Sequence, residues 1–267
     1  MRTVILASAE DVAAMNVMSR LRESFGFKEG PEAGVYVGQS VEARVLHTSA
    51  LYAEKAVERL EADLILVASK HVSESGRRCL LVHSTGNWTS DAKFGGLPSK
   101  LSMTSAKAVY TAVHALISSV EDLRLKDVEV GLEATHHGPF SEKPLLFVEV
   151  GSSMDSWTDI QMAEAAAEAC VNVCKNVETM QAEFAAGFGG GHYARDFFRA
   201  VVDGRYAVGH IASKHVFPLD EDLVRQAFTR TAERPRIGLV DWDGLRSEHR
   251  QNLLKTLEDM DVEVVKV

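Results

Sequence analysis

Short apolar segments alternate with longer amphipathic ones along the whole chain, and this alternation restricts the possible folds more than any other feature. Several of the apolar segments are nearly continuous runs, which are typical of strands buried on both faces. We expect strands at residues 3–7, 41–47, 63–69, 79–83, 127–133, 145–150, 205–211, 236–240 and 262–266.

The segments between these strands show the three-or-four-residue apolar spacing of helices. The spacing is seen in Val12, Met15, Met18, Leu21 and Phe25, in Val109, Val113, Leu116, Ile117 and Val120, and in Ile160, Ala163, Ala167, Cys170, Cys174 and Val177. Ser156 and Asp159 match a capping box at the start of the third of these helices. Further helices are expected near 193–203, 219–231 and 244–258.

Strands that alternate with helices predict an α/β fold, a three-layer sandwich with a mixed, mostly parallel sheet. No repeat, low-complexity tract or Pro-rich linker divides the sequence, so we interpret residues 1–267 as a single domain. The loop at 84–103 is long and rich in Gly, Ser and Thr, which is typical of a functional or mobile segment.

The composition adds the expected cellular context. Three scattered cysteines form no disulfide framework and favour a reducing compartment. The apolar run at the N-terminus is too short for a signal peptide, and no apolar stretch approaches the roughly 20 residues of a membrane span. We therefore expect a cytoplasmic protein without a membrane partner, and a monomer or weak homodimer.

Histidines and glutamates are concentrated where expected strands give way to loops. They are His71, His83, Glu133, His136, His137, Glu149 and His192. In open α/β sheets the carboxyl ends of the strands converge on the ligand crevice, so we expect these side chains to meet there. Neighbouring residues of a continuing strand point to opposite faces, which predicts that only one of His136 and His137 faces the site.

Imidazole and carboxylate groups are usual ligands of zinc, and a catalytic zinc keeps one position open for water. A single histidine in an α/β protein is more often structural than a ligand. The occurrence of several together is therefore stronger evidence for a functional site than any one of them. The chain has neither HExxH nor CxxC spacing, and spacing alone therefore indicates a metal only weakly.

Two glycine-rich segments could contact a substrate. Gly189, Gly190 and Gly191 precede both His192 and a helix, where backbone N–H groups can hold an anion; a tight turn is the alternative. Gly95 and Gly96 form a second such segment. Lys93 and Lys100 flank it and could contact a nucleic-acid backbone, with a solvated loop as the alternative.

A serine nucleophile competes with the metal interpretation. Ser73, Ser75 and Ser84 lie next to histidines in the sequence. The chain lacks a GxSxG elbow, however, and adjacency in sequence rarely produces a hydrogen bond in space. A serine hydrolase is therefore disfavoured.

Six ordered blocks carry a resemblance to a known family: SKHVSESG, LVHSTGNW, FGGLPSKLS, LEATHHGP, FVEVGSS followed by Trp157 and Asp159, and GFGGGHY with GHIAS downstream. Together they resemble the archaeal and plant type of D-aminoacyl-tRNA deacylase, also called D-tyrosyl-tRNA deacylase of the second type. The resemblance runs from about residue 3 to the C-terminus.

This resemblance implies hydrolysis of the ester that joins a D-amino acid to the 3′ end of tRNA, an association with zinc, and a sandwich fold like those of phosphorylases and peptidyl-tRNA hydrolases. We assign catalysis to His137, Glu149 and His192, and metal binding to His71, His83, Glu133 and His136. We assign substrate and tRNA binding to Lys93, Gly95, Gly96, Lys100, Gly189, Gly190 and Gly191. The number of zinc ions stays open.

Two alternatives remain on the sequence alone. One is a zinc-dependent amidohydrolase or peptidase on the same fold. The other is a non-catalytic RNA- or nucleotide-binding protein, in which the histidines and glutamates would be scattered over the structure.

The charge balance restricts how a tRNA could bind. With 29 Lys and Arg against 38 Asp and Glu, the net charge of −9 argues against a protein that wraps nucleic acid non-specifically. A deacylase needs to hold only the acceptor end, for which a few phosphate contacts are enough. We therefore expect a locally basic rim near the pocket, formed by Lys93, Lys100, Lys70 and Arg195.

Overall fold

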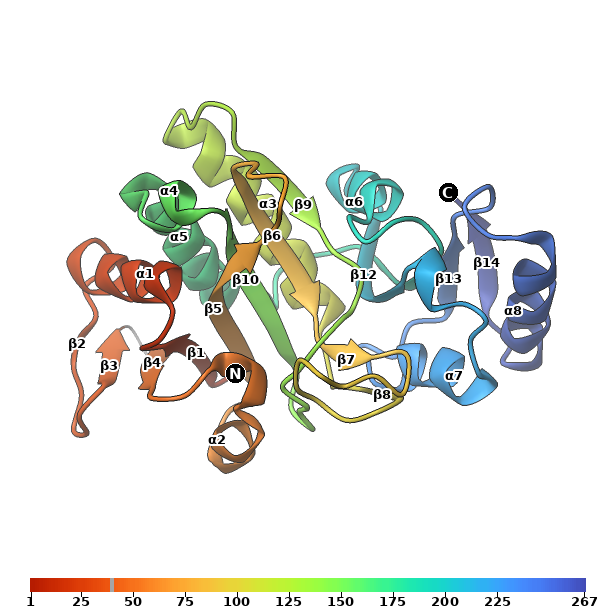
Figure 1. Ribbon diagram of the computed structural model, residues 1–267, viewed down its shortest axis with the longest axis horizontal. Coiled ribbons are helices and arrows are strands. Elements are labelled where there is room, and N and C mark those ends of the chain that lie inside the picture. Colours follow the sequence, from red (N-terminus) through yellow and green to blue (C-terminus); the bar gives the residue numbers. More distant parts are fainter. Residues whose placement is uncertain (39–40) are drawn as a thin grey trace.

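The computed structural model describes residues 1–38 and 41–267, and its largest element is an eight-stranded sheet (Figure 1). The strand order of this first sheet is β2-β3-β4-β1-β5-β10-β6-β9. Its strands are β1 (Thr3–Ser8), β2 (Lys28–Glu29), β3 (Val35–Gly38), β4 (Val41–Leu46), β5 (Leu64–Val72), β6 (Cys79–Ser84), β9 (Glu129–Leu132) and β10 (Leu145–Ser152).

The centre of the first sheet is parallel except at β6. Strands β4, β1, β5 and β10 run parallel to one another, whereas β6 pairs antiparallel with β10 and parallel with the edge strand β9. The end of β6 therefore lies beside the start of β10, with His83 opposite Phe147.

A second sheet of four parallel strands lies beside the first, with the order β12-β11-β13-β14. Its strands are β11 (Glu183–Phe188), β12 (Tyr206–Ala212), β13 (Ile237–Val240) and β14 (Glu263–Lys266). A short antiparallel ribbon joins β7 (Gly86–Asn87) to β8 (Lys100–Leu101) within the long loop predicted at 84–103.

Helices cover both sheets. They are α1 (Val12–Glu23), α2 (Glu54–Arg59), α3 (Ala106–Asp122), α4 (Met154–Trp157), α5 (Ile160–Asn176), α6 (Arg195–Val202), α7 (Glu221–Thr229) and α8 (Ser247–Asp259), with short 3₁₀ turns at Ala50–Tyr52 and Lys214–Val216. Helix α3 packs on α5 and also contacts strands of both sheets. Within the described residues, no helix is both long and apolar enough to cross a bilayer.

The two faces of the first sheet have different neighbours, because side chains alternate along each strand. Leu80, Val82, Val148 and their counterparts pack in the main core with apolar residues of α1, α3 and α5. On the opposite face, Val67 and Phe147 pack with Ala53 and Val57 of the α2 region. This second face also carries the side chains described in the next subsection.

The structure confirms the expected α/β class, the mixed and mostly parallel sheet, and the position of each expected strand and helix. Strands β2, β3, β7, β8 and β11 and helices α2 and α4 were not expected. The main core contains residues of both sheets. That residues 1–267 form a single domain stays a prediction. Val12 and Met15 are exposed, because α1 buries Ala13, Ala14 and Val17 instead.

The predicted capping box is wrong. Helix α5 begins at Ile160, and its N-cap is Asp159, whose carboxylate accepts hydrogen bonds from the backbone N–H groups of Gln161 and Met162. Ser156 lies inside the separate short helix α4, where its buried hydroxyl has no partner among the described residues. Asp159 alone therefore caps the helix, without the reciprocal bond of a capping box.

Candidate functional site

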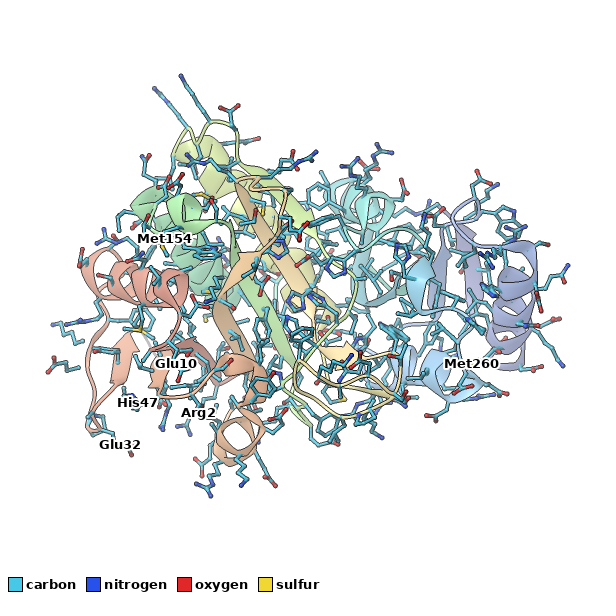
Figure 2. The ribbon with its side chains drawn as sticks, viewed as in Figure 1. Arg2, Glu10, Glu32, His47, Met154 and Met260 are labelled. Carbon is cyan, nitrogen blue, oxygen red and sulfur yellow. The ribbon has the colours of Figure 1, made fainter. Side chains whose placement is uncertain are left out.

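All seven histidines and glutamates singled out in the sequence lie together on the second face of the first sheet. His71 comes from β5, His83 from β6 and Glu149 from β10, while Glu133 directly follows β9. His136 and His137 lie in the loop after Glu133, and His192 follows β11. We call His71, His83, Glu133, His136, His137, Glu149 and His192 the His–Glu cluster. His47, on the loop after β4, lies towards the left end of the molecule in Figure 2.

The cluster forms across the face of the sheet, so the expectation that strand carboxyl ends bring it together is wrong for His83. Strand β6 runs against β10, and His83 consequently lies opposite the beginning of β10. His71, by contrast, lies opposite Gly151 near the end of β10. Glu149 stands between these two levels, and alternation along β10 directs it to the same face as Phe147.

Two buried carboxylates connect the histidines. Glu149 Oε2 lies 3.2 Å from His71 Nδ1, and Glu149 Oε1 lies 3.7 Å from His83 Nε2. Glu133 Oε2 lies 3.5 Å from His71 Nδ1, and Glu133 Oε1 lies 3.0 Å from His192 Nε2. Glu133 and Glu149 are only 1% and 3% exposed, so neither charge is screened directly by water.

Three imidazole rings are oriented by backbone carbonyl groups. His83, His136 and His137 each place Nδ1 at hydrogen-bond distance from a carbonyl oxygen, of Ser84 at 3.1 Å, Ala134 at 2.8 Å and Gly138 at 2.8 Å. Since a carbonyl oxygen only accepts, Nδ1 is the donor in each ring. This leaves Nε2 of neutral His136 and His137 with a free lone pair, as in metal-binding histidines.

Charge divides the cluster into two parts. Burial lowers the pKa of His137 to about 3 and that of His136 well below its ordinary value, with the neighbouring His83 adding to both shifts. Burial also acts against the charge on His71, but the hydrogen bond with Glu149 and the charge of Glu133 outweigh it and raise the pKa of His71. Burial also acts against the charge on Glu149, but its hydrogen bonds with His71 and His83 outweigh burial and lower the pKa of Glu149 to about 2.

The cluster contains donor groups of the kind that bind metal ions. Three sets have ligand atoms within 4.8 Å of one another: His83, His136 and His137; Glu133, His136 and His192; and His71, Glu133 and Glu149. Both carboxylate oxygens of Glu133 and Nε2 of His83 are buried and have no hydrogen-bond partner among the described residues. Buried polar atoms without partners are costly, and a bound cation would satisfy them.

Both His136 and His137 face the cluster, so the expectation that only one would do so is wrong. The strand does not continue through them: β9 ends at Leu132, and His137 adopts a φ of +43°. Their ring centroids lie 4.2 Å apart, and those of His83 and His136 lie 4.1 Å apart. The turn of the backbone therefore adds a second imidazole that strand geometry would have directed away.

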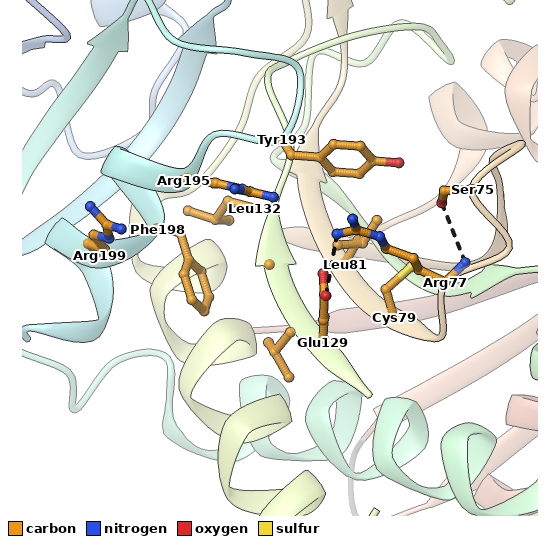
Figure 3. Close-up of a pocket in the computed structure, with 12 residues that line it drawn as sticks. Ser75, Arg77, Cys79, Leu81, Glu129, Leu132, Tyr193, Arg195, Phe198 and Arg199 are labelled. Carbon is orange, nitrogen blue, oxygen red and sulfur yellow. Dashed lines mark hydrogen bonds and ion pairs between the residues drawn. The ribbon is translucent and has the colours of Figure 1, made fainter. Parts of the chain in front are cut away.

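Two hollows lie near the cluster, of which one is lined by cluster side chains. The cluster cleft, with a volume of about 500 Å³, exposes His71, His136, His137, Glu149 and His192 beside Asp11, Lys70 and Phe94. The arginine cavity, of about 650 Å³, is bounded by β6, the edge strand β9 and α6, and is lined by Arg77, Arg195, Arg199, Leu81, Leu132, Phe198 and Tyr193, among others (Figure 3).

Tyr193 separates the two hollows and was not identified from the sequence. Its hydroxyl lies 3.1 Å from His71 Nε2 and donates to Ser73 Oγ at 3.3 Å. Tyr193 directly follows His192, which was the only signal available for it. His71 is held further by its carbonyl oxygen, which accepts a hydrogen bond of 3.0 Å from Trp157 Nε1.

The expected basic rim is present in part. Lys70 lines the cluster cleft and Arg195 lines the arginine cavity. Lys93 is largely exposed and pairs with Asp91 at 3.1 Å, next to Phe94 of the cleft. Lys100 lies in β8, and neither it nor Lys93 is among the described residues that line the two hollows. Their assignment to tRNA binding stays a prediction.

The glycines have tight structural roles. Gly95 adopts a φ of +83°, and a Cβ there would meet the carbonyl oxygen of Leu51 at 1.8 Å. Gly189 adopts a φ of +109°, and a Cβ there would meet Asp241 at 3.0 Å, whereas a Cβ at Gly191 would only touch the carbonyl oxygen of Tyr193 at 3.8 Å. Gly190 and Gly96 also adopt positive φ values. These turns place Phe94 and His192 at the cleft, and contacts of the glycines with substrate stay a prediction.

The serines do not form a nucleophilic centre with the histidines. Ser84 Oγ bonds to the hydroxyl of Thr104 and to the carbonyl oxygen of Gly209. Ser73 and Ser75 bond to each other at 3.1 Å. The compact cluster also differs from the scattered arrangement expected of a non-catalytic binding protein.

The comparisons with known proteins agree with the geometry. Residues 58–265 match a family model described as D-aminoacyl-tRNA deacylase. The D-aminoacyl-tRNA deacylases of Thermococcus kodakarensis and Pyrococcus horikoshii are 32% and 33% identical to this chain, each over 98% of it and 99% of the relative. A crystal structure of a conserved protein of unknown function is 28% identical, with a TM-score of 0.89 over 99% of this chain and 95% of that one.

Proposed function

Because this chain belongs to the D-aminoacyl-tRNA deacylase family and hydrolyses the ester of D-aminoacyl-tRNA, we propose that the His–Glu cluster is its catalytic centre. The observation that carries the assignment is the buried Glu133 carboxylate, whose two oxygens lack hydrogen-bond partners among the described residues although histidines surround it. An uncompensated buried carboxylate is retained where a ligand or ion completes its contacts.

The donor set fits zinc. Glu133, His136 and His192 combine one carboxylate with two imidazoles, and His136 and His192 open to the cluster cleft. Two histidines and a glutamate are a known ligand set of catalytic zinc, with the fourth position left for water or substrate. The hydrogen bond from His136 Nδ1 to the Ala134 carbonyl oxygen fixes Nε2 as the ligand atom. The other predicted ligands, His71 and His83, would border this set.

Zinc held by these residues would supply a Lewis acid that polarises the ester carbonyl. The chain itself contributes the groups that hold and move protons. His137 directs its unprotonated Nε2 into the cluster, where it can accept a hydrogen bond from an attacking water and orient it. Glu149 fixes the ring of His71 through Nδ1, while Tyr193 contacts the other ring nitrogen. His71 and Tyr193 together can donate a proton to the leaving ribose oxygen.

Deacylation of D-Tyr-tRNA and L-Tyr-tRNA, each with and without a chelator, tests this proposal. We expect hydrolysis of the D-ester only, loss of activity on chelation and recovery with added zinc. Equal rates of hydrolysis for D-Tyr-tRNA and L-Tyr-tRNA would contradict chiral selection by this site. Activity that survives chelation would contradict only the zinc assignment.

Variants of the cluster test the residue roles separately. Glu133→Gln is expected to lower both bound zinc and activity, because the neutral amide is a poorer ligand. His137→Asn is expected to lower kcat by about tenfold, for loss of one hydrogen bond that orients the water, while retaining zinc. Metal content measured by plasma mass spectrometry distinguishes the two. Unchanged deacylation in either variant would refute the role of that residue.

A further inference from the structure

The arginine cavity lies on the same face of the sheet as the His–Glu cluster and directly beside it. Leu81 lines the cavity and pairs in the sheet with Glu149 of the cluster. Gly131 also lines the cavity and pairs in the sheet with Leu81, on the same face. A ligand in this cavity could therefore extend to the cluster past the hydroxyl of Tyr193 without crossing any strand.

The lining combines an apolar floor with guanidinium groups. Leu81 and Leu132 are buried beneath the cavity, and the ring of Phe198 is half-buried at its side. Figure 3 shows Arg77 and Arg195 reaching into the cavity from opposite sides, with the ring of Tyr193 nearby. The cavity volume of about 650 Å³ falls within the roughly 300–1,000 Å³ of ligand-binding pockets.

The guanidinium groups are largely available to a ligand. Arg77 contacts Glu129 at 3.4 Å, a pair in which both side chains are more than half exposed. Arg199 contacts Asp196 at a similar distance. Arg195 forms no ion pair within the described part of the chain. Exposed pairs of this kind contribute little and can exchange for a phosphate, which arginine binds in a bidentate manner.

The side chains that line the two hollows have opposite net charge, and a bound zinc would reduce the negative charge of the cluster cleft. Asp11, Glu10 and Glu149 line the cluster cleft with Lys70 as its one lysine, whereas three arginines and Glu129 line the arginine cavity. An aminoacyl ester has matching ends, since the amino acid carries a cationic α-ammonium group and the RNA carries anionic phosphates. Electrostatic complementarity of this kind fixes the orientation in which a ligand binds.

We propose that the arginine cavity binds the 3′-terminal nucleotides of the tRNA, and that the aminoacyl group enters the cluster cleft on the other side of His71 and Tyr193. This proposal rests on the proposed catalytic centre. Arg77 and Arg195 bind phosphate, and a base stacks on Phe198 or Tyr193, as single-stranded nucleic acid does on aromatic side chains. The ester bond then lies between the hollows, next to the cluster.

Two substrates that share the same ester test the assignment: D-Tyr-tRNA and the D-tyrosyl ester of adenosine, which has no phosphate. For the variant Arg77→Gln/Arg195→Gln we expect KM for D-Tyr-tRNA to rise about tenfold or more, with kcat unchanged. The slope of log KM against log salt should fall by about 1.4, for two single-strand phosphate contacts. Hydrolysis of the adenosine ester should stay as in the wild type.

The matched control is Arg205→Gln/Arg225→Gln, which makes the same change in net charge at exposed arginines outside both hollows. This control should leave KM for D-Tyr-tRNA close to that of the wild type. If the cavity variant behaves like the control while the wild type is active, the proposal is overturned and the catalytic centre is not.

Three further outcomes would also contradict the proposal. An equal loss on the phosphate-free ester overturns the assignment, because the arginines would then act on the aminoacyl group or on catalysis. A change in preference among D-amino acids in the variant Phe198→Ala, seen on both substrates, would place the amino-acid side chain in this cavity instead. A wild type inactive on both substrates would overturn the catalytic centre together with this proposal.

Discussion

Gly151 provides the space into which the side chain of His71 turns: a Cβ at position 151 would lie 2.7 Å from the Cβ of His71 and 2.9 Å from its Cδ2. The two residues are paired across β5 and β10, and both belong to the face that carries the cluster. The same Cβ would meet Cys79 Sγ at 2.9 Å. Any side chain at position 151 would therefore displace the His71 ring from Glu149.

The variant Gly151→Ala is expected to lower kcat by about ten- to a hundredfold, because small displacements of a catalytic group carry losses of this size. Overpacking should also lower stability by about 1–3 kcal/mol. Gly238→Ala on β13 is the control, since its added Cβ meets only side-chain ends, of Leu257 at 3.2 Å and of Val262 at 3.5 Å. Equal kcat values for the two variants would contradict the role of Gly151.

The variant Tyr193→Phe removes the hydroxyl that lies 3.1 Å from His71 Nε2 and keeps the ring in the arginine cavity. We expect kcat to fall about tenfold, as for loss of one hydrogen bond to a catalytic group, with KM for tRNA nearly constant. Because Tyr193 is 42% exposed, the melting temperature should change little. A rise in KM at constant kcat would assign the hydroxyl to tRNA binding instead.

His210 should make stability depend on pH away from the cluster. It is fully buried, its Nε2 donates to the carbonyl oxygen of Ser102, and Nδ1 accepts from the hydroxyl of Thr135. Burial lowers the pKa of His210 to about 4 from an ordinary value of 6.5. The unfolded chain therefore takes up the proton first, and stability is lost as the pH falls from about 6.5 to about 4.

Urea unfolding of the wild type and His210→Gln at several pH values measures this loss. Between pH 7.5 and 4.5 the stability difference between the two should shrink by about 3 kcal/mol, at up to about 1.4 kcal/mol per pH unit. Shifts common to both proteins cancel in the difference. A difference that does not vary with pH would show that His210 is not held neutral.

Substitutions of Asp159 and Ser156, which the capping-box pattern had paired, are expected to have different effects on stability. Asp159→Ala removes the N-cap and the ion pair with Arg78, and is expected to cost about 1–2 kcal/mol. Ser156→Ala removes a buried hydroxyl that has no partner among the described residues, and should be neutral or slightly stabilising. Chemical denaturation measures the stability of both variants. A larger loss for Ser156→Ala than for Asp159→Ala would support the predicted capping box.

The composition of the His–Glu cluster could be predicted from sequence, but its geometry could not. Each member has a chemically informative side chain next to the end of an apolar run, and that local pattern is visible in the chain. The direction of β6 depends on pairing with β10, some 60 residues away, and no local pattern encodes it. The turn at His137 depends likewise on packing around Gly138, where a Cβ would meet the backbone of Gly95, Gly96 and Leu51.

Residues outside the histidine pattern were missed for a related reason. Gly151 and Tyr193 act by the space and the single hydroxyl they provide, properties that appear only once β5, β10 and the loop after β11 are assembled. Strand β11 was missed because its Ala–Ala–Gly segment lacks the β-branched residues that indicate a strand. Arg77 is visible as a charge in the sequence, but the cavity that gives it a role is formed by distant elements.

The antiparallel placement of β6 links catalytic competence to strand register. Because successive side chains of a strand face opposite ways, a slip of one residue would replace His83 in the cluster with Val82 or Ser84. The same slip would bring a charged or polar group into the helix-covered core, which would raise its free energy sharply. The packing of the core therefore disfavours the same shifted register that would remove His83 from the cluster, so a chain with that register would lose both activity and stability.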